Sequence, residues 1–391
     1  MVPEGWTEQA LGDWLIEYRE KSTAHNQHPV LTSSRNGLIP QSEYYGENRI
    51  TNRDNIGFHV IPPNYITYRS RSDDGLFFFN RNETAETGII SHFYPVFHFP
   101  SGSDQFFLSL MNYHRHRYIG YSVGTSQKVL SMTALKKMKF AIPPTTEQKK
   151  IAEILSTWDR AIEVAEAQLV CARTQKRALM QSLLTGRRRF PEFEGQEWKE
   201  VRLGDIATVD AQSLGAKTPQ NFAFNYISLS NVEPGRITGT LERMSFADAP
   251  SRARRKVNTG DLLVSTVRPN LMGFARVAKE HSSCIASTGF AVVSAGNEAD
   301  GSYLFHYLFS HHMKSQFHAL VVGSNYPAIN SADVKKLRIN LPPLDEQERI
   351  GEVLDDCDSE IVRLADEITK LRTEKKALMQ QLLTGKRRVS V

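Results

Sequence analysis

Cysteine is scarce in this sequence, and apolar residues never form a long uninterrupted run. Only Cys171, Cys284 and Cys357 occur among 391 residues, without the short spacings of a zinc site. Scattered cysteines are typical of reduced cytosolic thiols rather than of a disulfide framework. No run approaches the ~20 apolar residues of a membrane span, and MVPEGWTEQALGDW has neither the basic start nor the apolar stretch of a signal peptide. We therefore expect a cytoplasmic protein.

Catalytic signatures are also missing. The sequence contains no G-x-x-x-x-G-K-[ST], G-x-G-x-x-G or G-x-S-x-G motif, and no paired acidic cluster suited to two-metal nuclease chemistry. The segment Ile61-Pro62-Pro63-Asn64-Tyr65 has the letters of the DNA amino-methyltransferase tetrad in the wrong order. The net charge of +5 is compatible with a nucleic-acid partner without demonstrating one. We therefore expect a binding protein with no catalytic residues and no metal of its own.

What the sequence does contain is an internal repeat. IPPTTEQKKIAEIL at Ile142 matches LPPLDEQERIGEVL at Leu341, and LMQSLLTGRRR at Leu179 matches LMQQLLTGKRR at Leu378, both at an offset of 199 residues (341 − 142 and 378 − 179). Each half also begins with a tryptophan followed by Leu-Gly-Asp, at 6 and 11–13 and at 198 and 203–205. Residues 14–122 and 206–321, in contrast, show almost no similarity. A duplicated scaffold with two different inserts indicates two recognition surfaces presented in one geometry.

The repeated segments predict two long helices. Residues 147–185 contain no proline or glycine and are rich in strong helix formers. Thr145 or Thr146 is the expected N-cap and Gly186 the terminator, with Asp345 and Gly385 in the second copy. About 40 residues correspond to roughly 60 Å of helix.

Apolar residues recur every three or four positions along both helices, with Lys176 and Lys375 each occupying one slot of the series. A sustained period of this kind is typical of a coiled-coil seam, and tethering in one chain favours intramolecular pairing. The alternative is two separate amphipathic helices, each packed on its own domain. The predicted seam consists of Leu155, Trp158, Ile162, Leu169, Leu179, Leu183, Leu354, Cys357, Ile361, Leu364, Ile368, Leu371, Leu378 and Leu382.

The short linker at residues 187–197 must place the second domain near the C-terminal end of the first helix, which favours antiparallel pairing. We therefore predict an α+β protein with a pseudo-twofold internal repeat, in which a long antiparallel two-helix coiled coil separates two small α+β domains. The expected parts are a first recognition domain (1–144), a first spacer helix (145–189), a second recognition domain (190–343) and a second spacer helix (344–391).

The two inserts mix short β-rich runs with turns that contain basic and amide residues. Arginine and lysine can bind guanine edges, asparagine and glutamine can bind adenine edges, and any cation can hold a phosphate. Each such residue, taken singly, is more simply explained as a solvated surface group. The DNA-binding candidates are Arg49, Asn52, Arg53, Tyr68, Arg69, Arg71, His114, Arg115, Arg117 and Lys128 in the first half, and Arg252, Arg254, Arg255, Arg268, Asn270, Ser324, Asn325 and Tyr326 in the second.

The segment HRHRY at residues 114–118 also raises the possibility of a metal site. His114 and His116 alternate along the chain and have no acidic residue or cysteine nearby in the sequence. Metal binding usually requires such partners, so we expect none here.

The layout resembles the specificity subunit of type I restriction–modification systems. The resemblance rests on W-x4-L-G-D at the start of each half, P-P-x-x-E-Q before each helix and L-x-T-G-(R/K)-R-R after it. The order of segments resembles the family over the whole chain, but the specific motifs lie in the two helices and the residues just before them.

This resemblance implies that each variable domain recognises one half of a bipartite, asymmetric DNA site and that the helix pair sets the spacing. It also implies two methyltransferase subunits, which methylate adenine, and two motor–nuclease subunits as partners. S-adenosylmethionine, ATP and Mg²⁺ would be bound by those partners and not by this chain. Three alternatives stay open: a recognition subunit of another methyltransferase-based defence system, a coiled-coil scaffold that does not bind DNA, and a fused enzyme.

Overall fold

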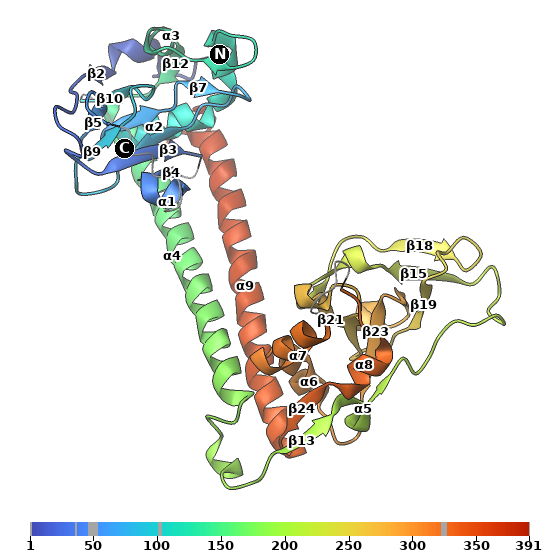
Figure 1. The fold of residues 1–391 in the computed structure, drawn as a ribbon. Helices are drawn as coiled ribbons and strands as arrows, with labels where there is room; N and C mark the ends of the chain where they lie inside the picture. The colour runs from blue at the N-terminus through green and yellow to red at the C-terminus, as the bar shows by residue number, and fades with distance from the viewer. Residues whose placement is uncertain (1, 36, 46–53, 101–103, 322–326, 391) are drawn as a thin grey trace. The chain divides into compact units, whose positions relative to one another are not determined.

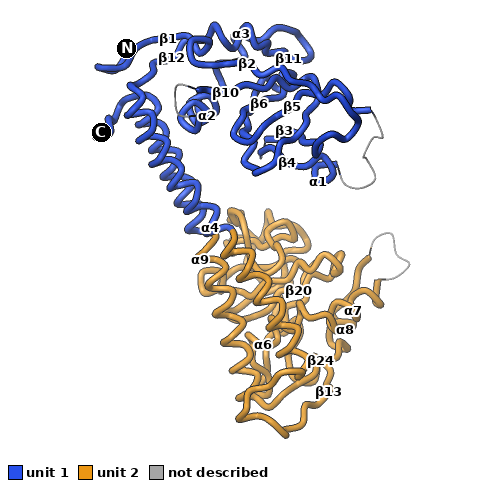
Figure 2. The backbone as a smooth tube through the Cα atoms, turned by 90° about the vertical axis from the view of Figure 1, so that its left-hand side faces the viewer, with its two compact units in different colours: residues 1–166, 366–391 blue, residues 167–365 orange. Residues whose placement is uncertain are grey.

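The computed structural model describes residues 2–35, 37–45, 54–100, 104–321 and 327–390. The chain forms two compact units, unit 1 with residues 1–166 and 366–391 and unit 2 with residues 167–365 (Figure 2). Each unit combines an α+β domain with segments of two long helices, α4 (Thr145–Leu183) and α9 (Leu344–Leu382) (Figure 1). The expected α+β fold with an internal repeat is confirmed, whereas the finer domain boundaries remain a prediction.

The α+β domain of unit 1 is built from short strands and helices. Two four-stranded sheets, in the orders β2-β10-β6-β8 and β4-β3-β9-β5, form its centre. Its elements are β1 (Thr7–Ala10), η1 (Leu11–Asp13), β2 (Ile16–Tyr18), β3 (Val30–Ser34), β4 (Gly37–Pro40), α1 (Gln41–Tyr45), β5 (His59–Ile61), β6 (Ile66–Tyr68), β7 (Arg71–Ser72), β8 (Phe79–Arg81), β9 (Gly88–Ile90), β10 (Val96–His98), α2 (Asp104–Tyr113), η3 (Arg115–Tyr121), β11 (Lys128–Val129), α3 (Met132–Lys136) and β12 (Lys139–Ile142).

The α+β domain of unit 2 also contains two four-stranded sheets, in the orders β14-β23-β20-β21 and β18-β15-β22-β19. Its elements are η4 (Pro191–Phe193), β13 (Lys199–Arg202), α5 (Leu203–Ile206), β14 (Ala207–Val209), β15 (Ala223–Ile227), η5 (Leu229–Asn231), β16 (Val232–Glu233), β17 (Arg236–Ile237), β18 (Glu242–Ser245), β19 (Ala253–Lys256), β20 (Leu262–Ser265), η6 (Pro269–Leu271), β21 (Phe274–Arg276), η7 (Lys279–His281), β22 (Ile285–Ser287), β23 (Phe290–Ala295), α6 (Gly301–Leu308), α7 (His311–Val321), α8 (Ser331–Lys336) and β24 (Arg338–Leu341).

The two domains share one topology although their inserts share almost no sequence. The strands of β2-β10-β6-β8 occupy the same chain order and the same places as those of β14-β23-β20-β21. The strands of β4-β3-β9-β5 correspond in the same way to β18-β15-β22-β19, and both sheets contain one parallel pair, β3·β9 and β15·β22. The antiparallel pairs β1·β12 and β13·β24 close the two domains alike. The duplication therefore includes the inserts as well as the helices.

Helices α4 and α9 end in the same way. Gly186 and Gly385 both have φ +67°, a left-handed conformation that favours glycine. The amide of Arg188 bonds the carbonyl of Ser182, and that of Arg387 bonds the carbonyl of Gln381, which satisfies carbonyls of the last turn. The predicted glycine terminators are confirmed. The predicted caps at Thr145 or Thr146 and at Asp345 are wrong by one or two residues, because the helices already include Thr145 and Leu344.

Within each unit the segments of α4 and α9 pair antiparallel. In unit 1, Asp159 of α4 pairs with Lys375 of α9, and Glu166 with Arg372. In unit 2, Lys176 of α4 pairs with Asp358 of α9. Each lysine in the apolar series thus meets an aspartate of the facing helix. Every predicted seam residue is buried or partly buried.

The helix ends also complete the cores of the α+β domains. Leu183 and Leu184, at the end of α4, belong to the core of unit 2 with Leu203 and Tyr303. Leu382 and Leu383, at the end of α9, belong to the core of unit 1. None of the helices in the described part of the chain is both long and apolar enough to cross a membrane.

Candidate nucleic-acid interface

A buried glutamate ties each α+β domain to the ends of both helices. In unit 2, Glu346 in the first turn of α9 is fully buried and accepts hydrogen bonds from Arg189 and Trp198. The Arg189 contacts are bidentate, at 2.9 Å from Nε and 2.6 Å from the terminal nitrogen, and the Trp198 Nε1 distance is 2.9 Å. These hydrogen bonds raise the pKa of Arg189 above its usual range. We call this group the unit 2 glutamate cluster.

Unit 1 contains the same arrangement. Glu147 in the first turn of α4 accepts a bidentate pair of bonds from Arg388 at 2.7 and 2.8 Å, and a bond from Trp6 Nε1 at 3.1 Å. Gln148 and Gln347, the residues that follow the two glutamates, donate to the carbonyls of Pro143 and Pro342. The repeated P-P-x-x-E-Q and T-G-(R/K)-R-R phrases thus meet in space, so each cluster fixes the place of one α+β domain on the helix pair.

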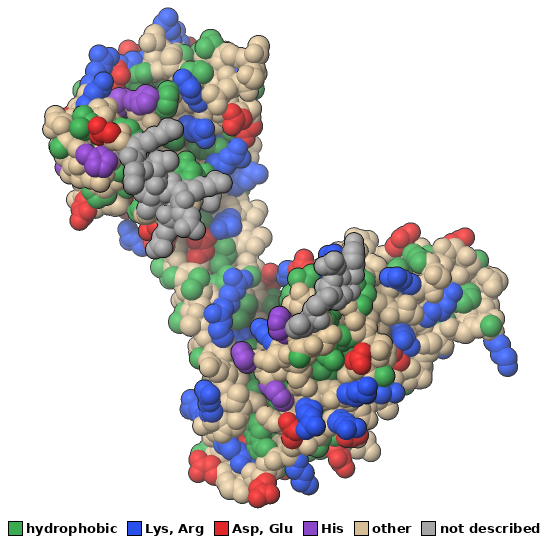
Figure 3. Space-filling model, viewed as in Figure 1, with side chains coloured by type: hydrophobic (Ala, Val, Ile, Leu, Met, Phe, Trp, Pro, Cys, Tyr) green, Lys and Arg blue, Asp and Glu red, His purple; other side chains and the backbone are tan. Residues whose placement is uncertain are grey.

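Charge alone does not identify a binding surface. In Figure 3, Lys and Arg side chains on the visible face of each unit are interleaved with Asp and Glu. Cavities and the partners of individual side chains are therefore better indicators of the interface than charge.

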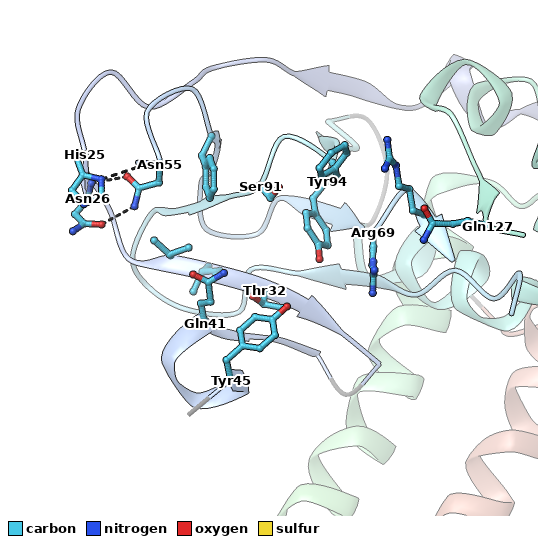
Figure 4. A pocket seen from close by; sticks show the side chains of 15 residues that line it. His25, Asn26, Thr32, Gln41, Tyr45, Asn55, Arg69, Ser91, Tyr94 and Gln127 are labelled. Atoms are coloured by element: carbon cyan, nitrogen blue, oxygen red, sulfur yellow. Dashed lines mark hydrogen bonds between the residues drawn. The ribbon is translucent and has the colours of Figure 1, made fainter. Parts of the chain in front are cut away.

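Unit 1 has an open cleft of about 400 Å³, which we call the unit 1 cleft. Its described lining residues include Arg69 and Arg71 but no aspartate or glutamate. Figure 4 shows Tyr45 and Gln41 on one side of the cleft and Tyr94 and Arg69 on the other. The hydroxyl of Tyr94 is a protonated donor at neutral pH, as in any tyrosine, and burial raises its pKa further. This set of donors without a competing carboxylate suits an anionic, hydrogen-bonding ligand.

The two arginines of the unit 1 cleft differ in how they are held. The guanidinium of Arg71 lies over the ring of Phe93, 4.2 Å from its centroid. Arg69 is exposed and has no carboxylate partner among the described residues. At the same end of the cleft, Gln127 donates to Asp73 Oδ1 at 2.9 Å.

Unit 2 has a shallower cleft of about 440 Å³, which we call the unit 2 cleft. Its wall is mainly apolar, with Leu229, Val232, Val267, Leu271 and Phe290. The charged residues of the wall are Arg268 and Glu233, and Glu233 is paired with Arg236 at 2.8 Å.

Several DNA-binding candidates lie elsewhere in unit 1. Tyr68 was wrongly selected, because its ring is fully buried in the core and its hydroxyl donates to the carbonyl of Leu130. His114 is partly buried beside Phe140, and this burial, with smaller contributions from Arg117 and His116, lowers its pKa to about 4. A neutral, packed imidazole is a poor phosphate ligand.

The remaining unit 1 candidates that the structure describes lie outside the cleft. Arg115 is exposed over the ring of Phe78, and Arg117 lies over Phe140 and donates to the carbonyl of Lys139. Lys128 donates to the carbonyl of Gly124.

The candidates of unit 2 also differ in their exposure and in the contacts that some of them make. Arg255 is already neutralised by Asp210, 2.8 Å away, and Arg254 lies over the ring of Phe246 and bonds the backbone. Arg252, Arg268 and Asn270 are exposed, and only Arg268 lines the cleft.

Six candidates cannot be placed. Arg49, Asn52, Arg53, Ser324, Asn325 and Tyr326 lie outside the residues that the structure describes.

Sequence reasoning missed the glutamate clusters and most of the cleft walls. The two glutamates and the two arginines recur at the same offset in the repeat, and this recurrence was the sequence signal that could have indicated the clusters. Tyr94, Gln127 and Leu271 carried no signal, because a cleft wall depends on strand pairing that the diverged inserts do not reveal.

One group of side chains among the described residues has the proximity of a metal site. His306, Asp355 and Asp358 bring potential ligand atoms within 4.8 Å of one another. Cations already neutralise both carboxylates, since Arg276 binds Asp355 and Lys176 binds Asp358. Burial alone would raise the pKa of Asp355, but hydrogen bonds from His306, Arg276 and Ser302 hold it far below its usual range. The cluster fits an ion-pair network better than a metal.

Comparison with known families identifies both halves of the chain. Residues 3–170 and 195–371 each match the model of the type I restriction modification DNA specificity domain. Two curated relatives come from Methanocaldococcus jannaschii: the putative type I restriction enzyme MjaX specificity subunit, 27% identical over 68% of this chain and 63% of the relative, and the MjaVIII specificity subunit, 27% identical over 68% and 66%. The matches thus span just under two thirds of each relative's length.

Solved structures show the same fold. The S subunit of a type I restriction–modification system from M. genitalium superposes with a TM-score of 0.60 at 14% identity, over 98% of this chain and 99% of that one. A chain from a structure concerned with complex assembly and conformational transition of a type I restriction–modification system gives a TM-score of 0.53 at 17% identity, over 98% of both chains.

Proposed function

Because this chain belongs to the type I restriction modification DNA specificity family, we propose that it is the DNA-recognition subunit of a type I restriction–modification enzyme. Each α+β domain recognises one half of a bipartite, asymmetric site, and the paired helices set the spacing between the halves. The observation that carries this proposal is a duplicated fold whose two copies share the glutamate cluster but have clefts of different chemistry.

The proposal assigns no catalytic residue to this chain. Two methyltransferase subunits that methylate adenine and two motor–nuclease subunits are the proposed partners. S-adenosylmethionine, ATP and Mg²⁺ belong to those partners in this proposal. The chain contributes specificity, because each domain recognises a few base pairs and the two domains together select a longer site.

Phosphate contacts explain how a protein with a net charge of only +5 could contribute to DNA affinity. Each contact made by a basic side chain releases a counterion, so binding by the assembled complex should weaken steeply as salt is raised. The modest charge also fits a recognition subunit that binds firmly only when partner subunits close around the DNA.

The test is genome-wide mapping of methylated adenines in a host that expresses this chain with its cognate methyltransferase. We expect one bipartite motif that is absent when the chain is omitted. Replacing residues 14–122 with the corresponding domain of another family member should change one half of the motif and leave the other and the spacing intact.

A change in both halves would contradict the modular assignment. Absence of any motif, together with failure of the purified complex to bind DNA, would favour a scaffold without DNA recognition. Methyl transfer by this chain alone would indicate an enzyme.

A further inference from the structure

The two clefts occupy equivalent places in the two α+β domains. In unit 1, the amide of Ser70 bonds the carbonyl of Phe93 at 3.2 Å, and the amide of Leu130 bonds the carbonyl of Ser70 at 2.9 Å. In unit 2, Thr266 bonds Gly289 at 2.8 Å and Ile329 bonds Thr266 at 2.9 Å through the same groups. These bonds align the two α+β domains residue by residue after strands β6 and β20.

The match equates cleft residues of opposite character. Arg69 corresponds to Ser265, Arg71 to Val267 and Tyr94 to Phe290, and all six residues line their clefts. The backbone is shared at these positions, while the side chains change from charged or hydroxylated to small or apolar.

We propose that these two equivalent clefts are the base-recognition sites of the two half-sites, with Arg69 and Arg71 contacting bases from the unit 1 cleft and Arg268 and Leu271 from the unit 2 cleft. The inference rests on the proposed function and deepens it, because it assigns specificity-determining residues to each half. The unit 1 cleft recognises base edges mainly by hydrogen bonds. The unit 2 cleft combines one arginine with apolar contact of the kind that a thymine methyl group offers.

The arginines of the unit 1 cleft are suited to base recognition. Packing of Arg71 on Phe93 holds a planar guanidinium in one orientation, which lowers the entropy lost when it forms a bidentate bond. Among the described residues, Arg69 has no carboxylate partner and no carboxylate lines the cleft. No described residue holds Arg69 or Arg71 in an ion pair that would have to break before the arginine pairs with guanine O6 and N7.

The unit 2 cleft is shaped by an unusual backbone. Arg268 (φ 49°) and Met272 (φ 56°) are left-handed non-glycine residues on either side of η6. Arg268 also precedes Pro269, a position that normally adopts an extended conformation. Such backbone strain clusters at ligand-binding sites. Here it accompanies a Leu271 side chain that is 62% exposed at the cleft wall, where burial would otherwise be favoured.

Other basic candidates are less suited to the role than Arg69 and Arg71. Arg255 would have to leave Asp210, and Arg117 and Lys128 are engaged with backbone carbonyls. These residues can hold phosphates or stabilise loops. The clefts are better suited to base recognition, because side chains from several strands meet there.

The experiment maps methylated adenines for variants of the full chain, each expressed with the cognate methyltransferase. Arg69→Ala and Arg69→Lys should both relax one or two base pairs of one half-site and leave the other half-site unchanged. Arg268→Ala and Leu271→Ala should relax only the opposite half. Discrimination at the affected base pair should fall on the order of tenfold to a hundredfold, the range of a lost bidentate base contact.

Matched controls are exposed arginines of the same units outside the clefts. Arg19→Ala in unit 1 removes a side chain that is 80% exposed, and Arg243→Ala in unit 2 removes an exposed residue of β18. Both controls should leave the motif intact. Arg69→Lys keeps the charge and the fold but cannot form the planar bidentate contact, so it separates base recognition from structural damage.

Three results would overturn the inference. An unchanged motif with methylation slowed at all sites would assign Arg69 and Arg268 to phosphates. A change in both half-sites from one variant would contradict separate clefts, and a changed motif in the controls would contradict the placement. If the unmodified chain directs no bipartite motif, the proposed function itself fails, and that outcome is distinct because it appears before any variant is compared.

Discussion

The unit 2 glutamate cluster makes the strongest prediction about stability. Glu346→Gln keeps the size of a fully buried side chain but removes the charge that neutralises Arg189. The bond from Trp198 would persist only as a weaker neutral one. The substitution therefore leaves the guanidinium of Arg189, whose side chain is only 16% exposed, without a counter-charge.

The magnitude follows from the burial. Removing one member of a buried ion pair costs about 3–5 kcal/mol, and the slight exposure of Arg189 favours the lower end, about 3 kcal/mol. A unit of roughly 200 residues loses about 2–4 °C in Tm per kcal/mol, so the transition of unit 2 should fall by roughly 6–12 °C.

The assay is calorimetric unfolding of the full chain, with Glu348→Gln as the control. Glu348 is exposed two residues further along the same helix and undergoes the same chemical change. A double variant Glu346→Gln/Arg189→Gln should recover part of the loss, because it leaves no unpaired buried charge. If Glu346→Gln destabilised no more than Glu348→Gln, the cluster would not hold the domain on the helices.

Three further predictions address the helices and one histidine. Leu364→Asp, at a position 3% exposed, should destabilise the paired helices by more than about 3 kcal/mol, measured by thermal unfolding followed by helical circular dichroism. Val362→Asp, at a position 58% exposed, should have little effect. Equal effects of the two variants would contradict the predicted seam. Insertion of four residues after Val170 adds about 6 Å of helix, so it should alter the half-site spacing or prevent assembly, and an unchanged spacing would argue against the helices as the spacer. Burial lowers the pKa of His114 to about 4 from about 6.5 in the unfolded chain, so its contribution to stability is present above pH 6.5 and is lost as the pH falls toward 4. The loss should be on the order of 1 kcal/mol at pH 5 after solvent screening, and His114→Gln should remove this slope in pH-dependent unfolding whereas His92→Gln, at an exposed position, should not.

The helices could be predicted from the sequence because their signals are local. Helix-forming residues without proline or glycine, a sustained apolar period and glycine terminators all act within a few turns, and the structure places helices at Thr145–Leu183 and Leu344–Leu382. The antiparallel direction followed from the short linker between the first helix and the second domain. Within unit 1, the pairs Asp159–Lys375 and Glu166–Arg372 show it directly, because the residue number in α9 falls as the number in α4 rises.

The site was less predictable because it depends on pairing between distant residues. Arg69 and Arg268 were selected on residue type and do line clefts, but Tyr68 was selected on the same grounds and belongs to the core. All three residues of β6 are buried, so an alternating pattern gave no sign that Tyr68 belongs to the core, and Arg69 lies one residue beyond the end of that strand. The contact of Arg189, in the basic run after the first helix, with Glu346 was also missed, because it joins residues 157 positions apart in the chain.

The shared topology of the diverged inserts explains how one frame can support two specificities. Around both clefts the chain is held by backbone hydrogen bonds, such as Ser70 to Phe93 and Thr266 to Gly289, which any side chain permits. The cores require apolar residues of suitable size at the buried positions, and many combinations satisfy that requirement. An exposed cleft side chain such as Arg69 lies outside the core, so its position can carry another residue type without a change of strand order. The glutamate clusters have no such freedom, because a buried carboxylate must keep both its arginine and its tryptophan partner, and this constraint accounts for why the helix ends are repeated while the residues facing the clefts are not.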